Sequence, residues 1–222
     1  MRKERLFLPP DSYTALPYRL IAYSWWWKRK NDRQMRQLSW EEKGLAMYTN
    51  GIKVNLTEEE VKEAIDWGAE NKDSPENIRS LYGFGELKGH KEYGYVATKF
   101  YTLAFLGCRS ARRYKSPGRD EIEEILSSKE FWIRICTYGD KIDFAENYRI
   151  VLKRGKKVIK PGTRGSPRWT KTTAVFPSSP SYQATVTAFF PYSAIDPKAK
   201  TKIILIKDKG ESSFEVNFSQ YK

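Results

Sequence analysis

The chain has 222 residues and carries 40 Lys and Arg against 27 Asp and Glu, a formal net charge of +13. Its 40% content of hydrophobic residues is enough to build a core and excludes a wholly disordered chain. A single histidine and two cysteines disfavour most metal centres and any disulfide scaffold, and no apolar run approaches the roughly 18 residues of a transmembrane helix.

Charge divides the chain into three regions: a basic, Trp-rich arm at 1–50, a helical region at 51–128 and a strand-rich region at 129–222. Residues 1–39 hold nine basic and three acidic side chains, and 129–222 hold eighteen and eight, whereas 40–128 is slightly acidic. Such asymmetry predicts contact with an anionic partner, either an unknown protein or an anionic polymer. A generally basic, soluble protein is the competing interpretation.

The arm contains aromatic residues followed directly by a basic cluster. Such a segment is typical of peripheral contact with a membrane surface or with a partner. Because one short segment anchors weakly, we favour the alternative that the arm folds back and buries some of its tryptophans. The candidate contact residues are Trp25, Trp26, Trp27, Lys28, Arg29 and Lys30.

The first helix is predicted from a start signal near residue 57. Thr57 and Glu60 have the spacing of a capping box, and the apolar positions that follow lie on one helical face as far as about Asn71. Residues 74–95 are rich in Gly and Tyr and predict a loop with at most one short helix.

Two further helices are expected, over about 96–114 and 119–127. The longer one has apolar residues at i, i+3, i+4, i+7, i+8 and i+11 from Phe100, a complete buried stripe. The shorter one begins with acidic residues, which suit the positive end of a helix dipole.

From residue 131 the apolar period changes from 3.6 to 2, which indicates strands. A turn at Arg154-Gly155 predicts one hairpin and Asp208-Lys209-Gly210 another. We therefore predict an α+β chain, with a helical N-terminal half, a boundary near Ser128 and a C-terminal antiparallel β-sandwich of immunoglobulin-like type; a small barrel is the competing architecture. The seven expected strands are 131–136, 148–153, 156–160, 170–176, 182–190, 201–207 and 213–218.

Few residues are suited to catalysis. The lone His90 lies in a polar loop, where we expect a solvent-exposed side chain and not a general base. Glu86 and Lys88 have the E-x-K spacing of many metal-dependent nucleases, but the surrounding glycines disfavour the rigid strand that this chemistry needs. Enzymatic activity is therefore disfavoured, and no catalytic residue, metal ligand or cofactor is assigned.

Cys108 and Cys136 do not have the paired spacing of zinc ligands. Cys108 falls on the apolar stripe of the second helix, so we expect buried, inert thiols. A disulfide between them stays open, because the geometry of a disulfide is not encoded in spacing.

Two basic clusters are candidate anion-binding sites. Helical spacing places Arg109, Arg112 and Arg113 on one face, and a second cluster surrounds the first hairpin turn. Both are suited to phosphate contacts, although a solvated helix face and a soluble turn are the favoured alternatives. The residues of the second cluster are Lys153, Arg154, Lys156, Lys157 and Lys160.

Five motifs carry a resemblance to known sequences: LTEEEVKEAIDWG (56–68), YRIVLKRG (148–155), VIKP (158–161), FFPY (189–192) and FEVNF (214–218). On these motifs, about three quarters of the chain resembles a group of uncharacterised bacterial proteins, many of them exported. The resemblance implies a structural kinship and transfers no activity or functional residue. The N-terminus departs from the group's pattern, because the Trp-rich arm stands where a cleavable signal is expected.

Taken together, the sequence predicts a non-catalytic binding or structural accessory protein that contacts an anionic partner. The bacterial envelope or periplasm is the expected setting, and the cytoplasm stays open as the alternative, because the chain shows no clear signal peptide. The alternative is a nucleic-acid-binding protein, in which the arm, the arginines of the second helix and the hairpin form one groove. A nuclease around Glu86 and Lys88 is the least favoured reading.

Overall fold

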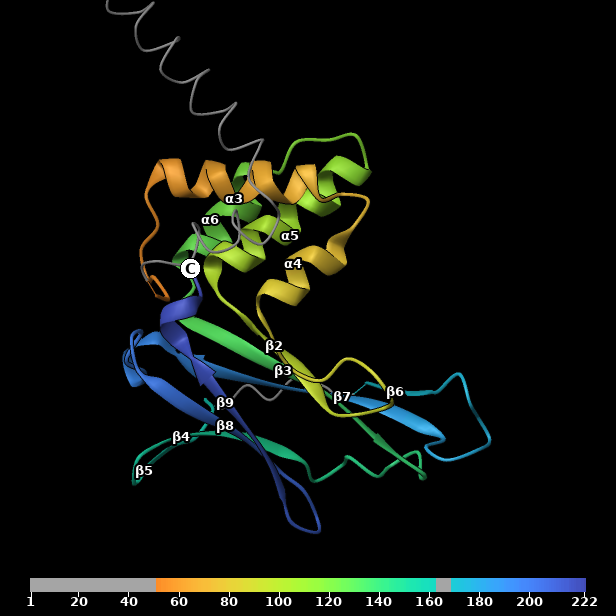
Figure 1. Ribbon diagram of the computed structural model, residues 1–222. Coiled ribbons are helices and arrows are strands. Elements are labelled where there is room, and N and C mark those ends of the chain that lie inside the picture. The colour runs from red at the N-terminus through yellow and green to blue at the C-terminus, as the bar shows by residue number, and fades with distance from the viewer. Residues whose placement is uncertain (1–50, 163–168) are drawn as a thin grey trace, which may run out of the picture. The chain divides into compact units, whose positions relative to one another are not determined.

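The computed structural model describes residues 51–162 and 169–222, which form a mixed α/β fold with four α-helices and two antiparallel sheets (Figure 1). The helices are α3 (Glu58–Glu70), α4 (Pro75–Leu81), α5 (Lys99–Arg112) and α6 (Arg119–Ser127). The five-stranded sheet has the order β1-β2-β3-β7-β6 and the four-stranded sheet the order β5-β4-β8-β9. The strands are β1 (Gly83–Gly85), β2 (Tyr93–Ala97), β3 (Glu130–Gly139), β4 (Arg149–Arg154), β5 (Lys157–Ile159), β6 (Trp169–Thr172), β7 (Tyr182–Pro191), β8 (Lys200–Ile206) and β9 (Glu211–Asn217).

The predicted helices are confirmed, and local chemistry fixes their ends. Thr57 and Glu60 form the capping box at the start of α3, since each backbone N–H donates to the other's side chain. Helix α6 spans the residues that the sequence predicts. Helix α5 begins at Lys99, later than expected. Thr98 is its N-cap, and the residues that precede Thr98 belong to β2.

Helices α3 and α5 pack so closely that their backbones touch at two glycines. A Cβ atom at Gly68 of α3 would lie 1.8 Å from the carbonyl oxygen of Ala104, and one at Gly107 of α5 would lie 2.3 Å from that of Ile65. Real Cβ atoms do not approach other atoms so closely, so this helix crossing requires glycine at both positions.

The prediction of a loop with at most one short helix over 74–95 is right about the helix, which is α4, but wrong about the rest. The stretch also forms β1 and most of β2, and β2 pairs in antiparallel register with β3. Gly94, which argues against a strand on propensity alone, is required in β2: a Cβ there would lie 2.4 Å from the carbonyl oxygen of Arg134 and 2.5 Å from the ring of Phe84. Close approach of neighbouring strands therefore explains the glycine.

All seven strands predicted after residue 130 are present, although β6 ends at Thr172, earlier than expected. The boundary predicted near Ser128 falls between α6 and β3, and the hydrogen bonds between β2 and β3 join the two sides of that point. The described part before residue 129 holds the four helices and two short strands.

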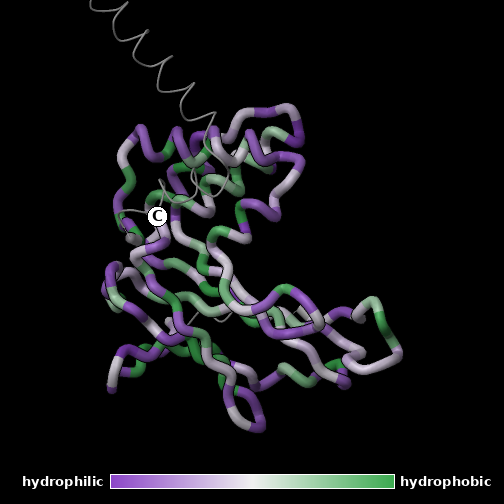
Figure 2. Tube along the Cα trace, viewed as in Figure 1, coloured by the Kyte–Doolittle hydropathy of each residue, from purple (hydrophilic) through white to green (hydrophobic). Residues whose placement is uncertain are grey.

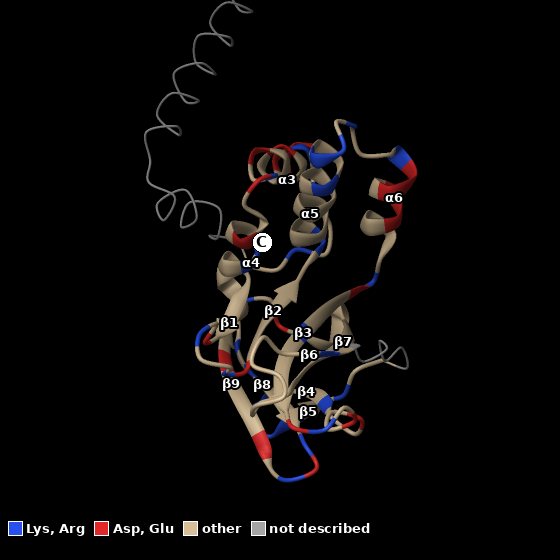
Figure 3. Cartoon of the chain, turned by 90° about the vertical axis from the view of Figure 1, so that its right-hand side faces the viewer, with Lys and Arg blue, Asp and Glu red and all other residues tan. Residues whose placement is uncertain are grey.

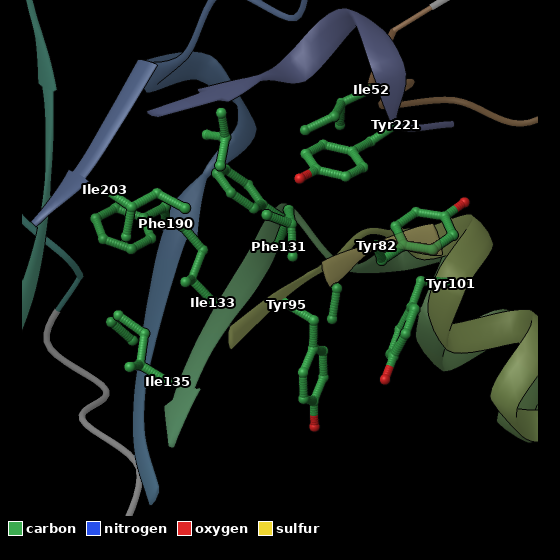
Figure 4. Packing of buried hydrophobic residues seen from close by; sticks show 14 of the residues in the cluster. Ile52, Tyr82, Tyr95, Tyr101, Phe131, Ile133, Ile135, Phe190, Ile203 and Tyr221 are labelled. Atoms are coloured by element: carbon green, nitrogen blue, oxygen red, sulfur yellow. The ribbon is translucent and has the colours of Figure 1, made fainter. Parts of the chain in front are cut away.

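Alternation along the strands builds the core between the two sheets. Phe131, Ile133 and Ile135 of β3 are fully buried and belong to the same cluster as Leu152 of β4 and Ile203 of β8. Figure 4 shows residues of this cluster pointing into the space between the strands, and Figure 2 shows hydrophilic residues in the loops outside it. Each such burial contributes about 1.5–3 kcal/mol to the free energy of unfolding.

Aromatic rings connect the helices to the sheets. The ring of Tyr82, which follows α4, lies 5.2 Å from that of Tyr101 on α5 and 5.7 Å from that of Tyr221. Tyr101 in turn lies 5.4 Å from Tyr95 of β2, and Phe218 lies 5.9 Å from Phe131 of β3. The helices and both sheets therefore share one hydrophobic core.

An ion pair joins the two sheets at their far end. Glu92 accepts hydrogen bonds from Thr137 Oγ1 at 2.7 Å, on the five-stranded sheet, and from Lys207 Nζ at 3.0 Å, just beyond β8 of the four-stranded sheet. Burial raises the pKa of Glu92, but hydrogen bonds from Ser212, Thr137 and Lys207 outweigh it and hold the pKa below its ordinary value.

Replacing Gly68 by Ala tests the helix crossing. Although alanine is the better helix former by about 1 kcal/mol, we expect Gly68→Ala to lower the free energy of unfolding by about 1–3 kcal/mol, because its Cβ collides with α5. Urea denaturation followed by circular dichroism measures the change, and Asp66→Ala, at an exposed position of the same helix, is the control. Equal or greater stability of Gly68→Ala would contradict the crossing.

Replacing Glu92 by Gln tests the ion pair through its pH dependence. Because the folded pKa is below the ordinary value of 4.5, the carboxylate stabilises the fold above that pH, and the contribution is lost as the pH falls through the folded pKa. We expect Glu92→Gln to be less stable by about 1–3 kcal/mol at pH 7, and the difference from the unmodified chain to shrink below about pH 4.5.

Urea denaturation at a series of pH values gives this difference. Glu86→Gln, in the same loop, is the control, because its partner Lys91 and Glu86 itself are both more than half exposed. A difference that is independent of pH would mean that the charge of Glu92 contributes nothing.

Candidate anion-binding surface

The basic hairpin that the sequence predicts is confirmed as β4 and β5. Arg154 pairs with Lys157, so the two-residue turn is Gly155-Lys156, one residue later than expected. Gly155 has φ of +56°, a conformation that glycine adopts without strain and that tight hairpin turns require. The turn geometry therefore places basic residues directly at the tip of the hairpin.

The hairpin continues onto the outer face of the four-stranded sheet. Lys153 of β4 pairs directly with Lys202 of β8. Strand alternation puts Arg149 on the same face as Lys153, and Lys200 on the same face as Lys202. Like charges directly opposite one another destabilise a sheet, so this face accumulates cations at a cost to stability.

Acidic residues neutralise only a small part of this basic surface, which we define as the hairpin together with Arg149, Lys200 and Lys202. Arg154 Nη1 lies 3.7 Å from Asp196 Oδ2, and Lys202 Nζ lies 3.6 Å from Glu215 Oε1. Within residues 51–162 and 169–222 the remaining cations have no acidic partner, and all of them are exposed. They are Arg149, Lys153, Lys156, Lys157, Lys160 and Lys200.

Sequence reasoning missed three members of the basic surface: Arg149, Lys200 and Lys202. The period-2 pattern of β4 and β8 contains the signal that each lies on the solvent face. Their position beside Lys153, however, follows from the pairing of two strands that are separated by about 50 residues in the chain. The cations of the hairpin do not form one flat patch. Arg154 follows Lys153 in β4, so its side chain points to the opposite face, and Lys157, which pairs with Arg154, shares that opposite face.

The predicted arginine cluster on α5 does not form one free face. Arg109 Nη2 lies 2.6 Å from Glu121 Oε1 of α6, whereas Arg112 Nε donates to the carbonyl oxygen of Lys72 after α3. Arg113 follows the end of the helix and, like the other two, is exposed. Two of the three arginines thus bind neighbours on different elements, although their side chains remain at the surface.

The α5 arginines and the basic surface lie on opposite sides of the five-stranded sheet (Figures 1 and 3). Helix α5 lies against the face of that sheet that carries Trp132, whereas the β4–β5 hairpin belongs to the four-stranded sheet on its other side. These two clusters therefore do not form a continuous groove. The third predicted element of that groove, the Trp-rich basic segment Trp25, Trp26, Trp27, Lys28, Arg29 and Lys30, falls outside the described residues.

Glu86 and Lys88 lie on the exposed loop between β1 and β2. The carboxylate of Glu86 is 2.5 Å from Lys91 Nζ, at a surface ion pair, and not in a cleft. No group of three or more His, Cys, Asp or Glu in the described part of the chain is arranged to hold a metal ion. The geometry here lends no support to a two-metal or single-metal nuclease centre.

The remaining candidates for catalytic chemistry are one histidine and two cysteines. His90 is exposed, and its ring lies edge-on to Tyr138 with centroids 5.3 Å apart. Cys108 and Cys136 are both free and buried, and burial raises the pKa of the Cys108 thiol. A buried thiol with a raised pKa is a weak nucleophile, as expected for a packing residue.

Comparisons with protein-family models, with curated proteins and with solved structures find no significant match to this sequence. Among the described helices none is long and apolar enough to cross a membrane. The case for a function therefore rests on the geometry and charge of the described surface.

Proposed function

We propose that this protein is a non-catalytic binding or structural accessory protein that contacts an anionic partner through its basic surface. One observation carries the proposal: six exposed cations of that surface lack an acidic partner within the described residues, and Lys153 stands directly opposite Lys202 on the outer face of the four-stranded sheet. An anionic ligand would relieve the repulsion between these lysines.

The spacing of the cations favours a polymer with repeated anionic groups. Neighbouring strands lie about 4.8 Å apart, and residues two apart on one strand are separated by about 6.8 Å. The paired strands thus hold several positive charges at fixed spacings, an arrangement suited to several phosphate, sulfate or carboxylate groups at once. We propose a bacterial envelope setting, supported by the resemblance over residues 56–218.

We also propose that the two sheets act as an immunoglobulin-like scaffold. The support is that the strands from β3 onward divide into three on one sheet and four on the other. Strands β1 and β2, which precede α5, extend the first of these sheets beyond that pattern. A scaffold of this kind presents a flat face to a partner, although fold alone carries little functional weight.

Reversing the charge of the hairpin tests the function. We expect the variant with Lys153, Arg154, Lys156 and Lys157 all changed to Glu to bind anionic polymers at least about tenfold more weakly than the unmodified chain, since it replaces four attractive contacts by repulsive ones. Binding is measured by titration with short single-stranded and double-stranded DNA, dextran sulfate and phosphatidylserine-containing vesicles, each at several salt concentrations.

The matched control changes Lys62, Lys88, Arg113 and Lys115 to Glu, four exposed cations that lie outside the basic surface and have no acidic partner among the described residues. It alters the net charge equally and should keep the affinity within about threefold. Equal losses in both variants, or the absence of binding to all four probes at low salt, would overturn the proposal. Binding to DNA alone with a steep salt dependence would favour the nucleic-acid alternative over an envelope polymer.

A further inference from the structure

A second surface of opposite character lies between the helices and the beginning of β3. Helices α5 and α6 and the beginning of β3 enclose an open groove of about 820 Å³. We name it the α5–α6 groove. Its size is within the range of about 300–1,000 Å³ that is typical of ligand sites. The residues that give it its character are Phe105, Glu124, Ile125, Glu130, Trp132 and Phe189.

The floor of the α5–α6 groove is apolar and only half-buried. Phe105 of α5, Ile125 of α6, Trp132 of β3 and Phe189 of β7 all keep part of their side chains accessible. Half-buried aromatic and aliphatic side chains that converge in one concave site lose further contact with water when a ligand enters. The groove therefore has a hydrophobic driving force for binding.

The orientation of Trp132 in the floor is fixed before any ligand arrives. The guanidinium of Arg134 lies 4.7 Å from the centroid of the indole ring. Arg134 is held in turn, because Nη1 donates to Tyr95 Oη at 3.0 Å and Nε to Thr187 Oγ1 at 3.3 Å. A preorganised aromatic surface lowers the entropy cost of binding.

The charged groups of the groove that lack a partner of opposite charge among the described residues are acidic. Its Arg109 is paired with Glu121, and the ammonium of Lys99 donates to the carbonyl oxygens of Val54 at 2.7 Å and Leu126 at 2.5 Å. Glu124 of α6 and Glu130 of β3 remain without a cationic partner among the described residues. Figure 3 shows acidic residues along α6, in contrast to the net positive charge of the chain.

We propose that the α5–α6 groove binds a short segment of a partner protein in which apolar side chains, including an aromatic one, are flanked by Lys or Arg. The apolar side chains fill the floor beside Trp132, and the flanking cations contact Glu124 and Glu130. Because these two carboxylates belong to different elements on the boundary of one apolar floor, an extended segment with separated charges matches them better than a single small cation.

The test uses a synthetic peptide, acetyl-Arg-Trp-Leu-Lys-amide, titrated calorimetrically into the full-length protein. We expect saturable binding that weakens roughly three- to tenfold in the Glu124→Gln/Glu130→Gln double variant, because two charged contacts are removed. Glu123→Gln, on the same helix but paired with Arg119 outside the groove, is the matched control and should leave the affinity unchanged.

A blocking variant keeps the test independent of the carboxylates. Thr102 of α5 lines the groove and is half-buried, so Thr102→Arg fills the space with a cation and should weaken binding at least about tenfold. Circular dichroism and melting temperature confirm that each variant folds. The hairpin variant with four glutamates should bind the peptide as the unmodified chain does, so failure here and failure of the proposed function are distinguishable.

Four results would overturn the proposal. The first is no saturable binding of the peptide. The second is unchanged affinity in the double variant and in Thr102→Arg. The third is equal binding of acetyl-Arg-Ser-Ser-Lys-amide, which lacks the apolar side chains, or of tyramine, a single aromatic cation. The fourth is a dimer in sedimentation experiments that Thr102→Arg dissociates, because a second copy would then be the occupant.

Discussion

The alternation of side chains along β3 is the constraint on which the rest of the fold depends. Phe131, Ile133 and Ile135 point to the four-stranded sheet and close the core, so Trp132 and Arg134 must point to the other face. A shift of one residue in the pairing of β3 with β2 or β7 would exchange these two sets and place an arginine in the core. The same register that stabilises the sheets therefore also supplies the tryptophan of the α5–α6 groove, and one strand links stability to the candidate binding surface.

The helices add a second constraint, at the glycine contacts between α3 and α5. With Gly68 and Gly107 the two backbones approach until they touch, and this leaves the opposite face of α5 directed toward α6 and β3. The buried ammonium of Lys99 then connects the segment before α3, through Val54, with the end of α6, through Leu126. Backbone carbonyls at the end of a helix are good acceptors for a cation, so this contact holds α6 in place while the space between α5 and α6 stays open.

The described part of the chain carries two surfaces of opposite chemistry. One is a set of exposed cations on and around β4, β5 and β8, and the other is an apolar groove with two carboxylates on α6 and β3 that have no cationic partner among the described residues. Opposite charge on separate surfaces steers different partners to different places, because a polyanion is repelled by the groove and a basic peptide by the hairpin. The shared hydrophobic core holds both surfaces on one body. Together, the two proposals describe an accessory protein that connects an anionic polymer with a second protein.

The sequence by itself determined the elements whose signals are local. The capping box at Thr57, the stripe that begins at Phe100, the hairpin around Gly155 and the seven strands after residue 130 all depend on neighbours within a few residues, and all are present. Only the tertiary structure decided the rest. Gly94 belongs in a strand because Arg134 and Phe84 leave no room for a Cβ. Lys202 joins the basic surface because β8 pairs with β4. Arg109 forms an ion pair with Glu121, and Arg112 donates to the carbonyl oxygen of Lys72. Such contacts join residues far apart in the chain, and spacing in the sequence carries no information about which distant elements meet.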